Sequence, residues 1–175
     1  MNLPNLLSLF RLFVTAFFIL LAAYGRFRLA LLLFVLQAVS DLLDGFFARR
    51  MGAKTSLGAY LDPLADKVML SSSYIVLCFQ RIIPLWLVSA VLIRDLVISF
   101  GFFVIVKRGL TMSPVPSFIS KMTTVFQMLT VVYVLLFADR FFEPFFFYTT
   151  AFLTAVSGFQ YVFAGWTVFF RKEIV

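Results

Sequence analysis

Four aspartates lie inside two long apolar segments of the 175-residue chain: Asp41 and Asp44 in the first segment, Asp62 and Asp66 in the second. A charged side chain at the centre of a membrane-spanning helix costs about 2.5–3.5 kcal/mol. Four converging anions also disfavour one another's ionised form in a low dielectric. The four aspartates therefore need a shared positive partner, and two bound divalent cations would supply it.

The spacing of the aspartates places each pair on one helical face. The positions i, i+3, i+4 and i+7 are occupied in the first segment by Asp41, Asp44, Gly45 and Ala48, and a similar face in the second holds Gly58, Asp62, Ala65 and Asp66. Asp41 precedes Arg50 by nine residues and Asp66 follows Leu57 by nine. At about 1.5 Å per residue, both lie about 13 Å from the connecting loop, so we expect the four carboxylates to meet at one depth.

The remaining residue types restrict which metal these positions could hold. The chain has no histidine, and its one cysteine, Cys78, lies in an apolar run. Histidine catalysis and an intrachain disulfide are therefore excluded. An all-oxygen ligand set favours Mg²⁺ or Mn²⁺ over Zn²⁺. Because Mg²⁺ is usually held by a few carboxylates together with substrate phosphates, the expected substrate is a pyrophosphate compound.

The composition excludes a water-soluble enzyme. Hydrophobic residues make up 63% of the chain and charged residues 13%, with 15 Lys and Arg against 8 Asp and Glu and a formal net charge of +7. This basicity suits an anionic lipid surface better than a nucleic acid.

The apolar segments predict an all-α integral membrane protein, a single polytopic domain over residues 1–175 with a bundle of six transmembrane helices. A span needs about 20 mostly apolar residues. The predicted spans are Asn5–Tyr24, Leu29–Ala48, Gly58–Phe79, Leu85–Val106, Phe118–Ala138 and Phe145–Phe170.

The basic residues predict the orientation, because cytoplasmic loops carry an excess of Lys and Arg. Seven basic residues lie in the loops after the second and fourth spans and in the C-terminal tail, against four in the alternate loops: Arg49, Arg50, Lys54, Lys107, Arg108, Arg171 and Lys172 against Arg26, Arg28, Arg81 and Arg140. Both termini and the residue 49–57 loop are expected in the cytoplasm.

The residues from Asp41 to Asp66 read DxxDGxxARx8GxxxDxxxD. This pattern resembles the signature of the CDP-alcohol phosphatidyltransferase family, with every fixed position present. The opening N-L-P-N-L-L-S-L-F-R, the I-R-D around Arg94 and the P-S-F-I-S-K ending at Lys121 are similar to the same family.

The resemblance implies a metal-dependent transfer of a phosphatidyl group from CDP-diacylglycerol to an alcohol, with release of CMP. It implies that Asp41, Asp44, Asp62 and Asp66 bind two ions, Mg²⁺ or Mn²⁺, and that Asp66 is also the general base. Four further positions resemble those that accommodate the CDP moiety: Gly45, Ala48, Arg49 and Gly58. It also implies a homodimer in a bacterial inner membrane, with the active site facing the cytoplasm.

The acceptor alcohol stays open between two members of this family. Phosphatidylglycerophosphate synthases, which use glycerol 3-phosphate, come first, and cardiolipin synthases, which use phosphatidylglycerol, come second. A phosphorylated acceptor needs cations, and the candidates are Arg94, Lys107, Arg108 and Lys121. The chain lacks the R-E…G-L-R and G-K-x-K-T elements that the former enzymes tend to show. A cation channel or transporter is the alternative from another class, although it does not require the fixed Gly and Ala spacing.

Overall fold

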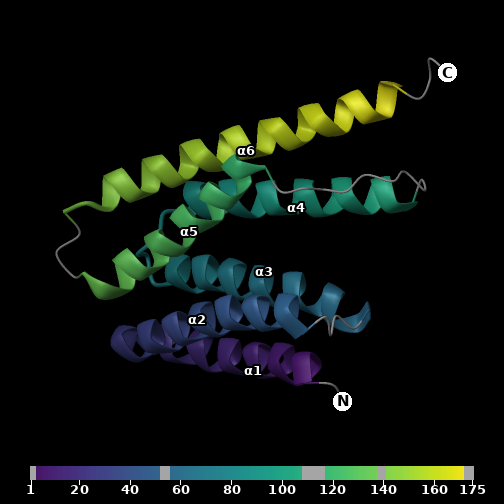
Figure 1. Ribbon diagram of the computed structural model, residues 1–175. Coiled ribbons are helices and arrows are strands. Elements are labelled where there is room, and N and C mark those ends of the chain that lie inside the picture. The colour runs from purple at the N-terminus through teal and green to yellow at the C-terminus, as the bar shows by residue number, and fades with distance from the viewer. Residues whose placement is uncertain (1–2, 52–55, 108–116, 138–140, 172–175) are drawn as a thin grey trace. The chain divides into compact units, whose positions relative to one another are not determined.

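The computed structural model describes residues 3–51, 56–107, 117–137 and 141–171, and describes side chains over residues 10–40, 67–101, 117–137 and 141–165. These residues form six α-helices and no β-strand (Figure 1). The helices are α1 (Leu3–Ala23), α2 (Phe27–Met51), α3 (Ser56–Phe79), α4 (Leu85–Lys107), α5 (Phe118–Leu136) and α6 (Glu143–Arg171). Each coincides with one predicted span to within three residues, so the all-helical prediction is confirmed.

Within the described residues, one helix is both long and apolar enough to cross a membrane, namely α5 (Phe118–Leu136). Three shorter apolar stretches cover Phe10–Ala23, Phe27–Ser40 and Lys67–Phe79. The six segments predicted as membrane spans are confirmed as helices. That all six cross a membrane is not confirmed.

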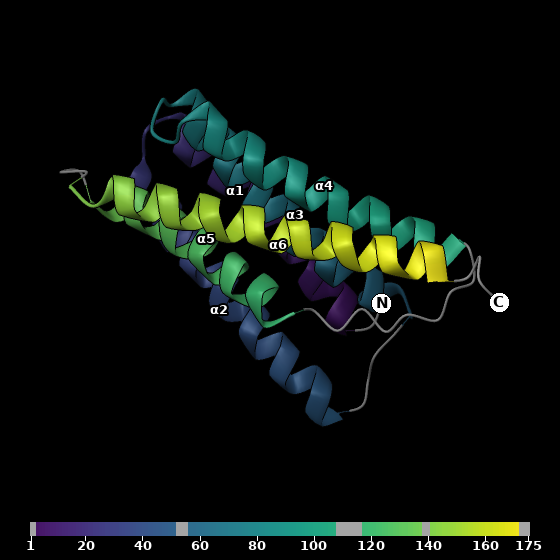
Figure 2. The same cartoon turned by 90° about the horizontal axis from the view of Figure 1, so that it is seen from above.

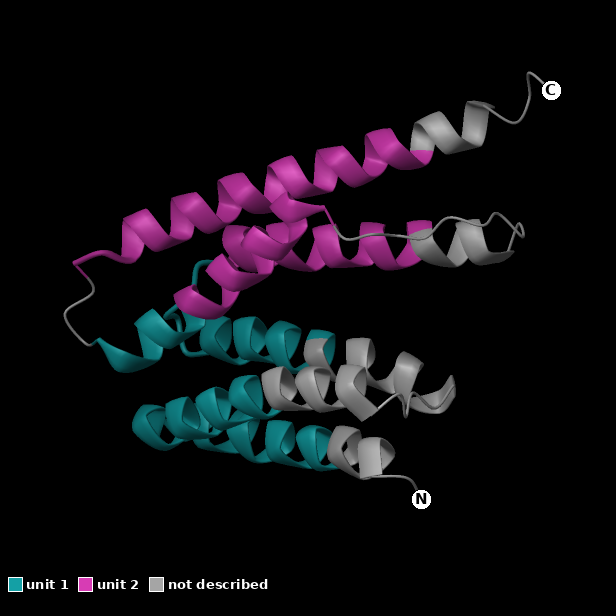
Figure 3. Cartoon of the chain, viewed as in Figure 1, with its two compact units in different colours: residues 1–84, 131–140 teal, residues 85–130, 141–175 magenta. Residues whose placement is uncertain are grey.

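The helices form two compact units (Figure 3). Unit 1 contains residues 1–84 and 131–140, and unit 2 contains residues 85–130 and 141–175. Unit 1 thus holds α1, α2, α3 and the last turns of α5, whereas unit 2 holds α4, α6 and the first part of α5. Both pairs of aspartates belong to unit 1.

In unit 1, α1 packs against both α2 and α3 (Figures 1 and 2). The α1–α2 contact is apolar towards the turn that joins them, where the Phe18 and Phe34 rings lie 5.8 Å apart and Ala22 and Ala30 are fully buried. Burial of a large aromatic side chain stabilises a fold by about 1.5–3 kcal/mol. The small alanines allow the two backbones to approach closely.

Two helix ends in unit 1 have the same left-handed capping geometry. At the end of α1, Gly25 has φ +71°, its N–H donates to the Ala22 carbonyl and the Arg26 N–H donates to the Leu21 carbonyl. At the end of α3, Arg81 occupies the equivalent position with φ +57°. This is a Schellman motif, which glycine adopts without steric cost and a residue with a Cβ does not.

In unit 2, α4 packs against α6, and the first part of α5 is hydrogen-bonded to α6. A seam of buried polar side chains runs between α5 and α6, spaced i, i+4 and i+7 on each helix: Thr123, Gln127 and Thr130 against Thr150, Thr154 and Ser157. The Thr130 and Thr150 hydroxyls lie 2.7 Å apart, and the Gln127 amide donates to the Thr154 hydroxyl at 3.3 Å. Such interhelical hydrogen bonds are how apolar helices satisfy polar side chains where water is absent.

The end of α3 gives a stability prediction. Replacing Arg81 by glycine removes the steric strain of a Cβ at positive φ, so Arg81→Gly should stabilise the protein by about 1 kcal/mol. The opposite change at the end of α1, Gly25→Ala, should destabilise it by a similar amount, because the strain arises from φ and no neighbour lies within 4 Å of the added Cβ. Thermal unfolding in detergent checks both, and equal midpoints for the two variants would contradict the prediction.

Candidate active site

The four motif aspartates lie in two consecutive helices of one compact unit. Asp41 and Asp44 belong to the second half of α2, and Asp62 and Asp66 to the first half of α3. Their side chains lie outside the residues whose side chains are described, as do those of Gly45, Ala48, Arg49 and Gly58. The roles assigned to these eight residues stay predictions.

The helix α1 contacts both helices that carry the aspartates. Hydrogen bonds to α1 therefore show how far along its axis each aspartate lies. Near one end of unit 1, the side chain of Gln80, the residue directly after α3, donates to the Ala23 carbonyl of α1. Asp66 lies fourteen residues before Gln80, and Leu9 lies the same number of residues before Ala23. Since both helices run in the same direction, Asp66 lies roughly level with Leu9, and Asp62 about 6 Å further toward the start of α1.

The other side of α1 sets the level of the α2 aspartates. The Gln37 amide donates to the Arg11 carbonyl at 2.6 Å and to the Thr15 hydroxyl at 2.8 Å. Asp41 lies one turn beyond Gln37, about 6 Å nearer the start of α1, and Asp44 almost a turn further. The backbone register thus brings both aspartate pairs to the first third of α1, in agreement with the common depth expected from the spacing.

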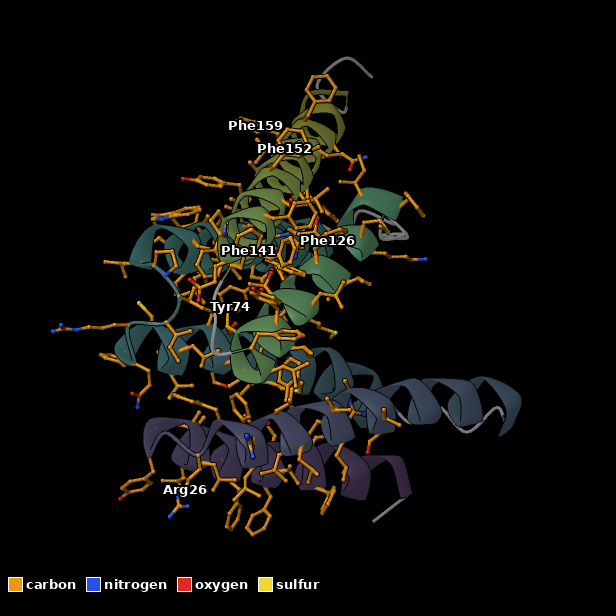
Figure 4. The ribbon with its side chains drawn as sticks, turned by 90° about the vertical axis from the view of Figure 1, so that its left-hand side faces the viewer. Arg26, Tyr74, Phe126, Phe141, Phe152 and Phe159 are labelled. Atoms are coloured by element: carbon orange, nitrogen blue, oxygen red, sulfur yellow. The ribbon has the colours of Figure 1, made fainter. Side chains whose placement is uncertain are left out.

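A buried polar cluster lies further along α1, toward its C-terminus, than the positions level with the aspartates. It consists of Arg11 (4% exposed), Thr15 (3%) and Gln37 (2%). The Thr15 hydroxyl donates to the Arg11 carbonyl at 2.8 Å, so one carbonyl accepts from two side chains. By contrast, Arg26, at the turn between α1 and α2, is exposed and points away from the helices (Figure 4).

Arg94, a candidate ligand for the acceptor, is buried where α4, α5 and α6 of unit 2 meet. Its Nη1 donates to the carboxylate of Asp95 at 2.7 Å, and its Nη2 donates to the Ser120 hydroxyl of α5 at 2.7 Å and to the Ser157 hydroxyl of α6 at 3.0 Å. Arg94 is 7% exposed, and its Nε–H has no hydrogen-bond partner among the described residues. The guanidinium therefore links three helices. The carboxylate and the two hydroxyls are the polar partners that an arginine inside an apolar helix requires.

The other acceptor candidates lie in different surroundings. Lys121, on the first turn of α5, is exposed. Lys107 is the last residue of α4 and Arg108 follows it, and the side chains of both lie outside the described residues. Their role in acceptor binding stays a prediction.

The donor set of the candidate site consists of carboxylate oxygens alone, which fits Mg²⁺ or Mn²⁺. Over the described side chains, no three Asp, Glu, His or Cys residues gather in a way that could hold a metal.

Two features of the structure were missed at the level of sequence. These are the cluster around Arg11 and Gln37 and the polar seam between α5 and α6. The signal for the seam is present in the sequence, because hydroxyl and amide residues recur at i, i+4 and i+7 within otherwise apolar helices. Arg11 carries a weaker signal, a lone arginine inside the first apolar span.

The sequence matches the family model for CDP-alcohol phosphatidyltransferase over residues 1–166. The chain belongs to this family. The membership predicted from the motif is confirmed, and with it the prediction of an enzyme of phospholipid biosynthesis. The family is membrane-associated.

Curated relatives carry two different activity names. The chain is 38% identical to a CDP-diacylglycerol–glycerol-3-phosphate 3-phosphatidyltransferase of Aquifex aeolicus, covering 74% of this chain and 73% of the relative. It is 37% identical to an enzyme of that name from Sodalis glossinidius, covering 94% and 95%. It is 34% identical to a cardiolipin synthase (CMP-forming) of Rattus norvegicus, covering 94% of this chain but 61% of the relative.

The ion pair in unit 2 gives a second prediction. Asp95→Asn leaves the buried Arg94 guanidinium without its carboxylate, and should destabilise the protein by about 3 kcal/mol. The double variant Arg94→Leu/Asp95→Leu removes both charges and should lose less stability than Asp95→Asn. Thermal unfolding of the three proteins in detergent measures this. If Asp95→Asn unfolds at the parental midpoint, the ion pair does not hold unit 2 together.

Proposed function

We propose that this protein transfers the phosphatidyl group of CDP-diacylglycerol to glycerol 3-phosphate, giving phosphatidylglycerol phosphate and CMP. The observation that carries the proposal is the complete motif DxxDGxxARx8GxxxDxxxD on α2 and α3, two helices that both pack against α1. The Sodalis glossinidius relative of similar length, named for this activity, supports the same substrate pair.

The chemistry follows from the residue types on these helices. Asp66 accepts the proton of the acceptor hydroxyl, because a carboxylate is the natural base in a chain without histidine. The hydroxyl oxygen then forms a bond to the phosphorus that bears diacylglycerol. The bond between that phosphorus and the bridging oxygen breaks, and CMP leaves with the bridging oxygen. The small residues Gly45, Ala48 and Gly58, together with Arg49, accommodate the cytidine and its diphosphate.

Asp41, Asp44, Asp62 and Asp66 are the residues that would hold two divalent ions. When bound, Mg²⁺ or Mn²⁺ at this position neutralises the charge that develops on the leaving phosphate. The aspartates would provide oxygen ligands, and the diphosphate of the substrate would supply further ones.

In this proposal all six helices cross the bacterial inner membrane, and the aspartate ends of α2 and α3 face the cytoplasm. Large apolar side chains that are exposed support lipid contact, among them Phe13 (63% exposed). Phe152 (66%) and Phe159 (78%) are two others (Figure 4). Acyl chains would stay in lipid while the nucleotide reaches water. A homodimer belongs to the same proposal.

Cardiolipin synthase is the second candidate function. It is favoured by the rat relative and by the absence of the R-E…G-L-R and G-K-x-K-T elements. With phosphatidylglycerol as acceptor, the chemistry at phosphorus is unchanged and the product is cardiolipin. An acceptor panel with labelled CDP-diacylglycerol separates the two: phosphatidylglycerol phosphate from glycerol 3-phosphate is the expected product, and cardiolipin from phosphatidylglycerol alone would replace the first candidate.

The proposed base gives a third prediction. Asp66→Asn should lower metal-dependent CMP release by at least about 10²-fold, because general-base assistance contributes 10²–10⁴-fold and the variant also loses a metal ligand. Asp139→Asn, an equivalent change outside the motif, should retain parental activity. CMP release at the parental rate by Asp66→Asn would show that this carboxylate is neither base nor ligand.

Lys121 gives a fourth prediction. If Lys121 binds the acceptor phosphate, Lys121→Gln should raise KM for glycerol 3-phosphate about tenfold and leave KM for CDP-diacylglycerol unchanged, a loss typical of one charge-assisted hydrogen bond. Arg81→Gln, which removes an exposed charge at the end of α3, is the control. Steady-state kinetics measure both constants, and an unchanged acceptor KM in Lys121→Gln would remove this residue from the acceptor site.

A further inference from the structure

The buried Arg11 of α1 needs a counter-charge within its own unit. A buried guanidinium is tolerated only when paired. The described side chains of unit 1 include no Asp or Glu, and the whole sequence of unit 1 contains five: Asp41, Asp44, Asp62, Asp66 and Asp139. The last turn of α5, after which Asp139 follows in the sequence, lies at the end of unit 1 remote from the start of α1 (Figure 3), and Asp139 itself lies outside the described residues. The motif aspartates are the carboxylates that remain.

The register on α1 brings Arg11 within one or two turns of those aspartates. Asp41 and Asp66 lie roughly level with Leu9, two residues before Arg11, as the hydrogen bonds of Gln37 and Gln80 establish. Side chains on a helix lean toward its N-terminus. A long arginine side chain that starts at Arg11 therefore extends toward the level of the aspartates and not away from it.

Gln37 fixes this arrangement. It lies on the same face of α2 as Asp41, one turn earlier, and its amide binds the turn of α1 that carries Arg11. The Gln37 Oε1 atom is buried and accepts no hydrogen bond from the described residues. One polar side chain thus ties the α1 turn that holds a buried cation to the α2 face that holds two anions.

We infer that Arg11 is a positioning residue for the metal site, held in place by Gln37. Its guanidinium gives counter-charge to the aspartates and orients the carboxylate oxygens that the metal does not use. This inference rests on the proposed metal-dependent function. Groups that support metal ligands from outside in this way typically change metal affinity 10–100-fold when removed.

The test is equilibrium Mn²⁺ binding to the purified full chain in detergent without substrate, followed by the electron paramagnetic resonance signal of free Mn²⁺. Arg11→Gln should raise the Mn²⁺ Kd at least about tenfold, and Arg11→Lys should restore most of the loss. Gln37→Leu keeps the charge but releases the helix contact, and should give a smaller rise in the same direction. If Arg11→Gln fails to fold, the Mn²⁺ Kd of Gln37→Leu is the measurement that decides.

Two control variants separate this role from a structural one. Arg28→Gln makes the same chemical change at an exposed position of α2 and should leave the Kd unchanged. Thr130→Val removes a hydrogen bond of the polar seam between α5 and α6 without changing charge, and should lower the unfolding midpoint but not the Mn²⁺ affinity.

The outcomes distinguish this inference from the proposed function. If the parental chain binds Mn²⁺ and Arg11→Gln binds it equally or more tightly, Arg11 does not position the ligands, and the metal site itself stands. If the parental chain binds no Mn²⁺, the proposed metal site fails and this inference fails with it.

Discussion

Carboxylates in apolar helices are the constraint on which this molecule depends. An anion of this kind is costly away from water, so each of the four aspartates needs opposite charge close by. The helices that carry them supply few cations: Arg49, Arg50 and Lys67 on α2 and α3, with Arg28 at the far end of α2. In the proposed function, divalent ions and Arg11 of the neighbouring helix α1 would complete the charge balance. The packing of α1 against both α2 and α3 places a buried arginine, Arg11, in the same unit as the four aspartates.

In unit 2, a buried charge finds its opposite charge within the protein. Arg94 finds a carboxylate at the adjacent position, and hydroxyls from α5 and α6 take up its second nitrogen. Here the polar groups satisfy one another within protein, and they join three helices. In the proposed function, the four aspartates of unit 1 would instead be balanced in part by divalent ions that enter with the substrate.

The helices were predictable because their apolar segments are long and are separated by charges, glycine or proline. The common depth of the aspartates was predictable from helical rise alone, and the register of α1 with α2 and α3 agrees with it. The partners of Arg94 were not predictable, because Ser120 and Ser157 lie 26 and 63 residues away in sequence. Only the packing of α4 with α5 and α6 brings them together. Arg11 and Gln37 were missed for the same reason, since their contact depends on how α1 packs against α2.

The most direct test of the central claim is the electron paramagnetic resonance spectrum of Mn²⁺ bound to the full chain with CDP-diacylglycerol. In this account the four aspartates would hold two ions close enough together for their electron spins to couple. We expect two Mn²⁺ per chain with a spin-coupled spectrum. A single uncoupled ion per chain, or none, would contradict the account.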